Sequence, residues 1–168
     1  MTEPGERVAL DLIDQDGRRF THEALTGSPA LVYFGFLNCR VVCPRSLAKI
    51  AEIRALLADA GRTIRVVYIS VDPARDTPGA MKAYLADRHP GVTGLTGTQA
   101  QVDRAKAAFR VFSRRVADDA DPDGYAMPHT AFIYLLDAEG RIAAHFPDIR
   151  TARDIARTIA DHSAPRAG

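Results

Sequence analysis

Apolar residues occur along this chain in short runs and in helical repeats, which predicts strands and helices in alternation. The runs at 31–36 and 64–71 have the length and the β-branched or aromatic content of buried strands. Between them, apolar residues recur about every fourth position from 44 to 60, which predicts an amphipathic helix. Because a strand, a helix and a strand in this order form a parallel pair with a right-handed crossover, we predict an α/β sheet.

Further elements follow from turn and capping residues. Thr77 before Pro78, and Thr98, are good helix N-caps, and Thr151 with Asp154 forms a capping box. The remaining expected segments are a hairpin at 8–20 around a turn at 14–17, a short helical turn or loop at 21–25, helices at 78–88, 99–109 and 151–162, a turn at 94–97, a short strand at 111–116, an exposed acidic loop at 117–124, a second hairpin of strands 130–136 and 141–146, and a loose tail at 163–168.

Composition limits the class of protein. A length of 168 residues suits a single domain over 1–168, and a net charge of +1 gives no electrostatic footprint for nucleic acid. Two cysteines do not make a disulfide scaffold, and no stretch approaches the roughly 20 apolar residues of a membrane span. The first seven residues do not form a secretion signal. We therefore expect either a cytoplasmic protein or one whose N-terminal anchor precedes the given sequence.

Both cysteines lie where the first strand gives way to its helix. Cys39 is expected in the turn and Cys43 at the helix N-terminus, with Pro44 in the first helical turn. The helix dipole favours thiolate there, and thiolate both ligates metal and attacks disulfides. Two thiolates suit Cu(I), and an added imidazole gives a set that holds either copper oxidation state or zinc. The alternative from this pair alone is two buried structural cysteines.

Six segments occur in an order and at spacings that carry a family resemblance. They are Asp-Gln-Asp-Gly at 14–17, Tyr-Phe-Gly-Phe at 33–36, Cys-x-x-x-Cys-Pro at 39–44, Ile-Ser-Val-Asp-Pro-x-Arg-Asp-Thr-Pro at 69–78, Gly-Leu-Thr-Gly-Thr at 94–98, and His-Thr with Tyr-Leu-x-Asp-x-x-Gly at 129–140. Across nearly the whole chain this pattern resembles the Sco/SenC family of copper-binding proteins. The resemblance implies a thioredoxin-like fold, a central mixed sheet flanked by helices, with an added N-terminal β-hairpin.

The same resemblance implies a site and a role. It implies copper bound by Cys39, Cys43 and His129, and assembly of the dinuclear copper centre of cytochrome c oxidase by copper delivery or by reduction of the target's cysteines. The implied partners are the copper-bearing oxidase subunit or another copper chaperone, and we expect a monomer. Family members are usually tethered by one N-terminal helix, so the implied location is periplasmic or inner-membrane anchored. Without an upstream anchor the protein would be cytoplasmic.

The chain departs from the family pattern beside the expected ligands. Val41 and Pro128 stand where acidic residues are common, and Arg40 adds a cation. These changes favour Cu(I) over Cu(II), whose charge the lost carboxylates would offset. Arg40 also favours thiolate. The second hypothesis is therefore a thiol-disulfide oxidoreductase that uses Cys39 and Cys43 as a redox pair, with no stable copper role. A peroxidase is a third possibility for which the sequence shows no signature.

Several residues near these motifs have two interpretations. Without the resemblance, His129 would be interpreted as a packed or surface residue. Met127 is either a fourth soft ligand or a strand-edge residue facing the core. Asp72 and Arg75 either shape the rim of the site or form a loop-closing salt bridge. The acidic loop at 117–124 is either solvated or a weak calcium site, although its aspartates do not follow the EF-hand order.

Overall fold

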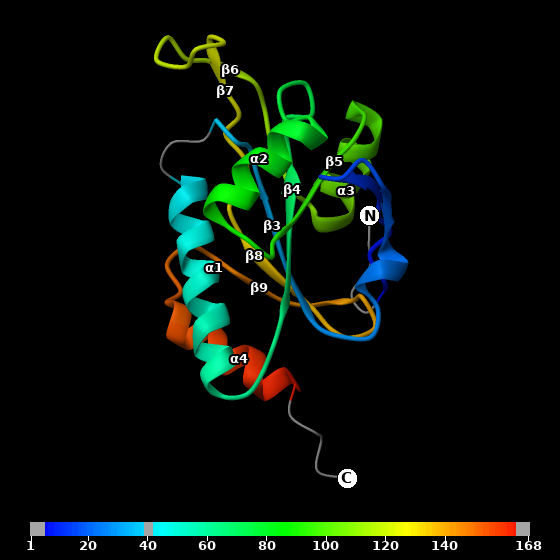
Figure 1. Cartoon of the computed structure of the whole chain (residues 1–168), viewed down its shortest axis with the longest axis vertical. Helices are drawn as coiled ribbons and strands as arrows, with labels where there is room; N and C mark the ends of the chain where they lie inside the picture. The colour runs from blue at the N-terminus through cyan, green and yellow to red at the C-terminus, as the bar shows by residue number, and fades with distance from the viewer. Residues whose placement is uncertain (1–5, 39–41, 164–168) are drawn as a thin grey trace.

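A seven-stranded mixed sheet forms the centre of the molecule (Figure 1). The structure is a computed structural model that describes residues 6–38 and 42–163, with the backbone alone at 42, 43 and 163. The strand order is β2-β1-β5-β4-β3-β8-β9. β3, β4 and β5 run parallel, and the outer pairings are antiparallel. The predicted thioredoxin-like α/β fold is thereby confirmed.

The bounds of the elements are close to those expected from the sequence pattern. The sheet consists of β1 (Asp11–Asp14), β2 (Arg19–Thr21), β3 (Ala30–Gly35), β4 (Arg65–Ser70), β5 (Thr93–Thr96), β8 (Ile133–Leu136) and β9 (Ile142–Phe146), and a separate hairpin consists of β6 (Val116–Ala117) and β7 (Tyr125–Ala126). The helices are η1 (His22–Leu25), α1 (Val42–Asp59), α2 (Pro78–Arg88), α3 (Gln99–Phe109) and α4 (Ala152–Ser163). Within the described residues, none of these helices has the length and apolar character needed to cross a membrane.

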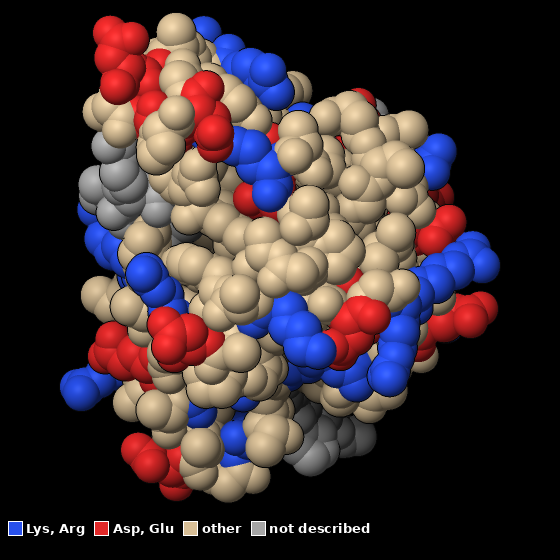
Figure 2. Space-filling model, turned by 45° about the horizontal axis from the view of Figure 1, so that its top comes forward, with Lys and Arg blue, Asp and Glu red and all other residues tan. Residues whose placement is uncertain are grey.

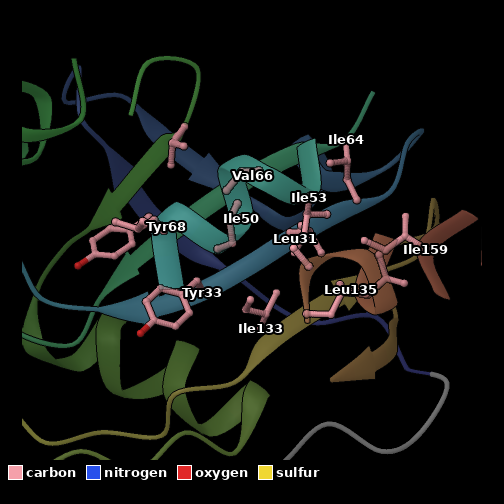
Figure 3. Close-up of a cluster of buried hydrophobic side chains, with 14 of the residues drawn as sticks. Leu31, Tyr33, Ile50, Ile53, Ile64, Val66, Tyr68, Ile133, Leu135 and Ile159 are labelled. Atoms are coloured by element: carbon pink, nitrogen blue, oxygen red, sulfur yellow. The ribbon is translucent and has the colours of Figure 1, made fainter. Parts of the chain in front are cut away.

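Two apolar clusters hold helices against the two faces of the sheet. Successive side chains of a strand point to opposite faces, so Leu31 packs toward α1, α2 and α4, whereas Val32 packs toward α3. Figure 3 shows the first cluster, in which Ile50 and Ile53 of α1 lie over the strands. Each of these aliphatic side chains contributes about 1.5–3 kcal/mol by its burial. The parallel strands are covered on both faces, which explains their continuous apolar runs.

The expected turn at 94–97 is wrong, because residues 93–96 form β5. This strand pairs with β4 and with β1. A Cβ built on Gly94 would lie 2.6 Å from Leu85 Cδ1 and 2.9 Å from Met81 Cε. Gly94 therefore lets α2 approach the sheet closely, and the glycine that suggested a turn is a packing residue.

Three further expectations need correction. The strand expected at 111–116 is reduced to β6 at 116–117, with an isolated bridge between Ser113 and His129. The first strand of the N-terminal hairpin begins at Asp11 and not at Val8. The acidic loop is not wholly solvated, because Asp121 is buried, 7% exposed, against a guanidinium. Of the expected tail, residues 164–168 lie outside the described residues.

Candidate metal centre

The segment that carries both cysteines connects the carboxyl end of β3 to α1. Cys39 lies outside the described residues, and Cys43 is described by its backbone alone, in the first turn of α1. The helix is already formed at Val42, so Pro44 follows two residues later and not at the helix start. It still lies in the first turn, where backbone N–H groups have no partner within the helix. The placement of the Cys43 backbone agrees with the expected helix N-terminus.

His129 lies beside the strand end from which the cysteine segment begins. Its ring centroid is 5.8 Å from that of Phe36 and 6.3 Å from that of Tyr33, with edge-on geometry in both pairs. Phe36 directly follows β3 and precedes Cys39 by three residues. The fold therefore brings a residue from late in the chain to the start of the cysteine segment.

A backbone hydrogen bond orients the imidazole. The Nδ1 atom of His129 lies 3.0 Å from the carbonyl oxygen of Met127. Because a carbonyl can only accept, this contact suits the tautomer in which Nδ1 donates, and in that tautomer Nε2 is the atom that would bind a metal. Ligating histidines usually donate their other ring nitrogen in this way. The half-buried side chain of Met127 packs against the apolar cluster on the α3 face. Of the two interpretations of Met127, a fourth ligand or a core-facing residue, the structure agrees with the second.

The donor set predicted from the sequence suits a soft metal ion. Two thiolates and one imidazole match the preference of copper for sulfur and nitrogen ligands. Among the side chains that the structure describes, no three His, Cys, Asp or Glu residues gather as a metal site. The set Cys39, Cys43 and His129 stays a prediction, because both sulfur atoms lie outside that part of the chain.

A buried carboxylate supports the turn before Cys39. Asp76 is 2% exposed, and its Oδ2 atom accepts hydrogen bonds from the Ser70 hydroxyl at 2.7 Å and from the Leu37 N–H at 3.2 Å. Burial raises the pKa of Asp76 to about 6, against the lowering effect of these two donors. The charge of Asp72 raises it further, and the charge of Arg75 lowers it. Asp76 was not among the predicted site residues, although it belongs to the segment at 69–78 that carries part of the family resemblance.

Arg75 connects the β4–α2 loop to the β6–β7 hairpin. Its Nε lies 2.6 Å from Asp72 Oδ2, which is the loop-closing salt bridge offered by the sequence, and its Nη1 lies 2.8 Å from Asp121 Oδ1. The guanidinium also stacks 3.8 Å from the ring centroid of Tyr125. Although burial lowers the pKa of Arg75, its hydrogen bond to Asp72 and the charge of that residue keep it above the usual value. The guanidinium therefore stays charged and holds the hairpin in place.

The hairpin extends beyond the sheet at the same end of the molecule as the carboxyl end of β3 and the start of α1 (Figure 1). The amide of Asn38 lies 3.5 Å from Asp123 Oδ2, which joins the residue before Cys39 to the acidic loop. Figure 2 shows acidic side chains gathered at the upper left corner of the face in view, with basic and acidic groups interspersed elsewhere on that face. The acidic loop thus lies beside the turn that leads to the first cysteine.

The fold and the placement of His129 define a thioredoxin-like protein with a dithiol segment and a histidine at one sheet edge. The family model described as SCO1/SenC matches residues 6–164, and the chain belongs to this family. An SCO2-like protein of Rickettsia conorii is 43% identical over 137 residues, which cover 82% of this chain and 67% of the relative. The mitochondrial protein SCO1 of Saccharomyces cerevisiae is 38% identical over 131 residues, 77% of this chain and 44% of the relative.

Solved structures of family members have the same fold. The structure of Bradyrhizobium japonicum ScoI with copper bound is 37% identical, with a TM-score of 0.81 over 92% of this chain and 98% of the other. The crystal structure of yeast Sco1 with copper bound is 33% identical, with a TM-score of 0.86 over 98% of this chain and 92% of the other. The predicted membership of the Sco/SenC family is confirmed.

Proposed function

We propose that this protein is a Sco-type metallochaperone that binds copper as cargo through Cys39, Cys43 and His129. The observation that carries the proposal is the position of the His129 ring, 5.8 Å from the ring of Phe36 at the strand end that precedes Cys39. The two solved relatives described above hold copper, which supports copper as the cargo. The contact of Nδ1 with the Met127 carbonyl suits the tautomer in which Nδ1 donates and Nε2 would bind the metal, which supports His129 as a ligand.

The residues around the proposed ligands favour Cu(I). Val41 and Pro128 provide no charge where the family pattern has carboxylates, and Arg40 adds a positive charge. Cu(I) prefers soft thiolates and carries one charge less than Cu(II), so it depends less on nearby carboxylates. The two cysteines supply the affinity, and the imidazole completes the set when Cu(II) is bound.

The proposed partner is the copper-bearing subunit of cytochrome c oxidase or another copper chaperone. This follows from the role that the Sco/SenC family resemblance implies. We place the protein outside the cytoplasm, facing the periplasm from the inner membrane, as the family resemblance implies. A dithiol at this position can either deliver copper to the partner or reduce the partner's cysteines.

Copper titration of the reduced protein tests the proposal. We expect one Cu(I) per chain, loss of tight binding in Cys39→Ser and in Cys43→Ser, and a weaker complex with selective loss of the Cu(II) form in His129→Ala. His145→Ala is the matched control, because His145 lies exposed on β9. A wild-type protein that takes up no copper would reject the metallochaperone role.

The second candidate is a thiol-disulfide oxidoreductase, which Arg40 and the helix N-terminus favour by stabilising thiolate. It predicts a reversible Cys39–Cys43 bond whose reduction potential lies above roughly −300 mV, the range of labile disulfides. It also predicts activity in insulin reduction. Copper uptake without such activity favours the first candidate, and the reverse result favours the second.

A further inference from the structure

Asp76 is a buried carboxylate whose direct partners are unusual. Carboxylates are rarely buried unless they are paired with a cation. Asp76 is 2% exposed, yet its described donors are a hydroxyl, that of Ser70, and a backbone amide, that of Leu37. The neighbouring Arg75 directs its described hydrogen bonds to Asp72, Asp121 and the carbonyl of Tyr125.

This arrangement costs folding stability at neutral pH. Burial raises the pKa of Asp76 to about 6, so the folded protein must ionise this group in a site that disfavours charge. A neutral side chain of the same shape would avoid that cost. A group that lowers stability and still has a defined hydrogen-bond geometry is typical of a functional site and not of a structural core.

The backbone group that Asp76 binds lies directly before the cysteines. Leu37 N–H belongs to the turn after β3, two residues before Cys39. Gly35, the last residue of β3, is paired with Ser70, and its carbonyl accepts from Val71 N–H at 2.8 Å. The loop that carries Asp76 and the turn that leads to Cys39 therefore leave the same edge of the parallel sheet, side by side.

We propose that Asp76 is a positioning residue of the dithiol site, which holds the turn before Cys39 through the Leu37 N–H and thereby fixes the geometry of Cys39 relative to Cys43. A hydrogen bond that an ionised carboxylate accepts is about twice as strong as a neutral one. A fixed turn raises the effective concentration of one thiol at the other, and this aids both metal chelation and disulfide closure. The inference rests on the proposed function of the two cysteines.

The test compares Asp76→Asn with wild type in three measurements. We expect a higher urea midpoint at pH 7.5, because the buried charge is removed, together with about tenfold weaker Cu(I) binding, the lower end of the usual effect of supporting residues. We also expect the equilibrium constant for closing the Cys39–Cys43 disulfide to fall about tenfold. If the role of Asp76 were purely structural, its replacement would lower the urea midpoint together with copper binding and disulfide closure.

The disulfide equilibrium is measured in a buffer of oxidised and reduced dithiothreitol. The two protein thiols form one S–S bond and lose two protons and two electrons, and the oxidised reagent takes them up as its own S–S bond breaks to two thiols. Asp137→Asn is the matched control, because Asp137, like Asp76, accepts two hydrogen bonds, in its case from the N–H groups of Glu139 and Arg141, but lies in the β8–β9 turn. It should leave copper affinity and the disulfide equilibrium unchanged.

The outcomes separate the two proposals. Wild-type protein without copper uptake rejects the copper role, and the disulfide equilibrium then still tests Asp76. Two results would overturn the positioning role of Asp76. In the first, Asp76→Asn has the same Cu(I) affinity and the same disulfide equilibrium as wild type. In the second, both fall but the urea midpoint falls with them. The wild type offers an independent check if the variant does not fold. The Leu37 amide proton resonance should move between pH 5 and 7 as Asp76 titrates, and a constant resonance would overturn the inference.

Discussion

At the scale of single residues, two buried acids near the site have pKa values shifted in opposite directions. Burial raises the pKa of both Asp76 and Asp121, but the outcome depends on their partners. Asp121 accepts from the Asp123 N–H and faces Arg75, and these contacts bring its pKa below the usual value. Asp76 has no cation bonded to it in the described part, and its pKa rises to about 6. At Asp121 the Asp123 N–H and the Arg75 guanidinium together outweigh burial, whereas at Asp76 burial outweighs the two hydrogen-bond donors and the charge of Arg75.

The first prediction concerns the pH dependence of stability. The pKa of Asp76 is about 6 when folded and near 3.8 when unfolded, so the folded state binds its proton more tightly. Its stabilising effect is complete below about pH 4 and is lost as pH rises through 6. Each pKa unit corresponds to about 1.4 kcal/mol, so the wild type should lose on the order of 3 kcal/mol relative to Asp76→Asn between pH 4 and 8.

Urea unfolding of both proteins across this pH range measures the difference. Taking the difference between the two curves removes the contribution of other carboxylates. Asp72 and Arg75 are the charged groups that act on Asp76 besides its hydrogen-bond donors, and they are common to both proteins. Two parallel stability curves would show that Asp76 has an ordinary pKa in the folded state.

The sequence indicated some functional residues and not others, for a physical reason. Cys39, Cys43 and His129 could be proposed because their side-chain chemistry is rare and their motifs are short. Asp76 could not, because its importance comes from burial, which only the packing of the β4–α2 loop against the turn after β3 produces. For the same reason Asp121 was expected in solvent.

At the scale of elements, the contact between β5 and α2 depends on a single missing side chain. Replacing Gly94 by Ala would place a methyl group 2.6 Å from Leu85 Cδ1. Overpacking of this kind costs about 1–3 kcal/mol, so we expect Gly94→Ala to lower the free energy of unfolding by that amount in urea titration.

Gly79→Ala is the control for this prediction. Gly79 lies in α2, and a Cβ there meets nothing within 4 Å. Since alanine is a better helix former than glycine, Gly79→Ala should not lose stability. If Gly94→Ala and Gly79→Ala had the same free energy of unfolding, the close contact of α2 with β5 would not depend on the missing side chain of Gly94.

Elements with strong periodicity were predicted well, and short ones were not. The helix α1 and the strands β3 and β4 have long apolar patterns that a sequence displays directly. β5 has two polar threonines and a glycine in four residues, so its pattern indicates a turn, and only its two neighbouring strands make it a strand. The two-residue strands of the β6–β7 hairpin are too short to show any period.

At the scale of the whole molecule, the carboxyl edge of the parallel strands gathers groups from four parts of the chain. The turn after β3 leads to the cysteines, the β4–α2 loop supplies Asp76 and Arg75, the β6–β7 hairpin is bonded to that loop, and His129 precedes β8. Ligand sites in α/β sheets gather at this edge. The Sco/SenC fold thus brings a late histidine beside the strand end from which the dithiol segment begins.

We propose that Cys39, Cys43 and His129 bind one copper ion together, and X-ray absorption at the copper edge detects the sulfur and nitrogen neighbours of that ion. We expect two sulfur neighbours and at least one imidazole nitrogen in the Cu(II)-loaded wild type and in His145→Ala, whereas His129→Ala should lose Cu(II), and any copper that it retains should lack the nitrogen neighbour. A spectrum that is the same in wild type and His129→Ala, or a wild-type spectrum without two sulfur neighbours, would show that these three residues do not form the copper site.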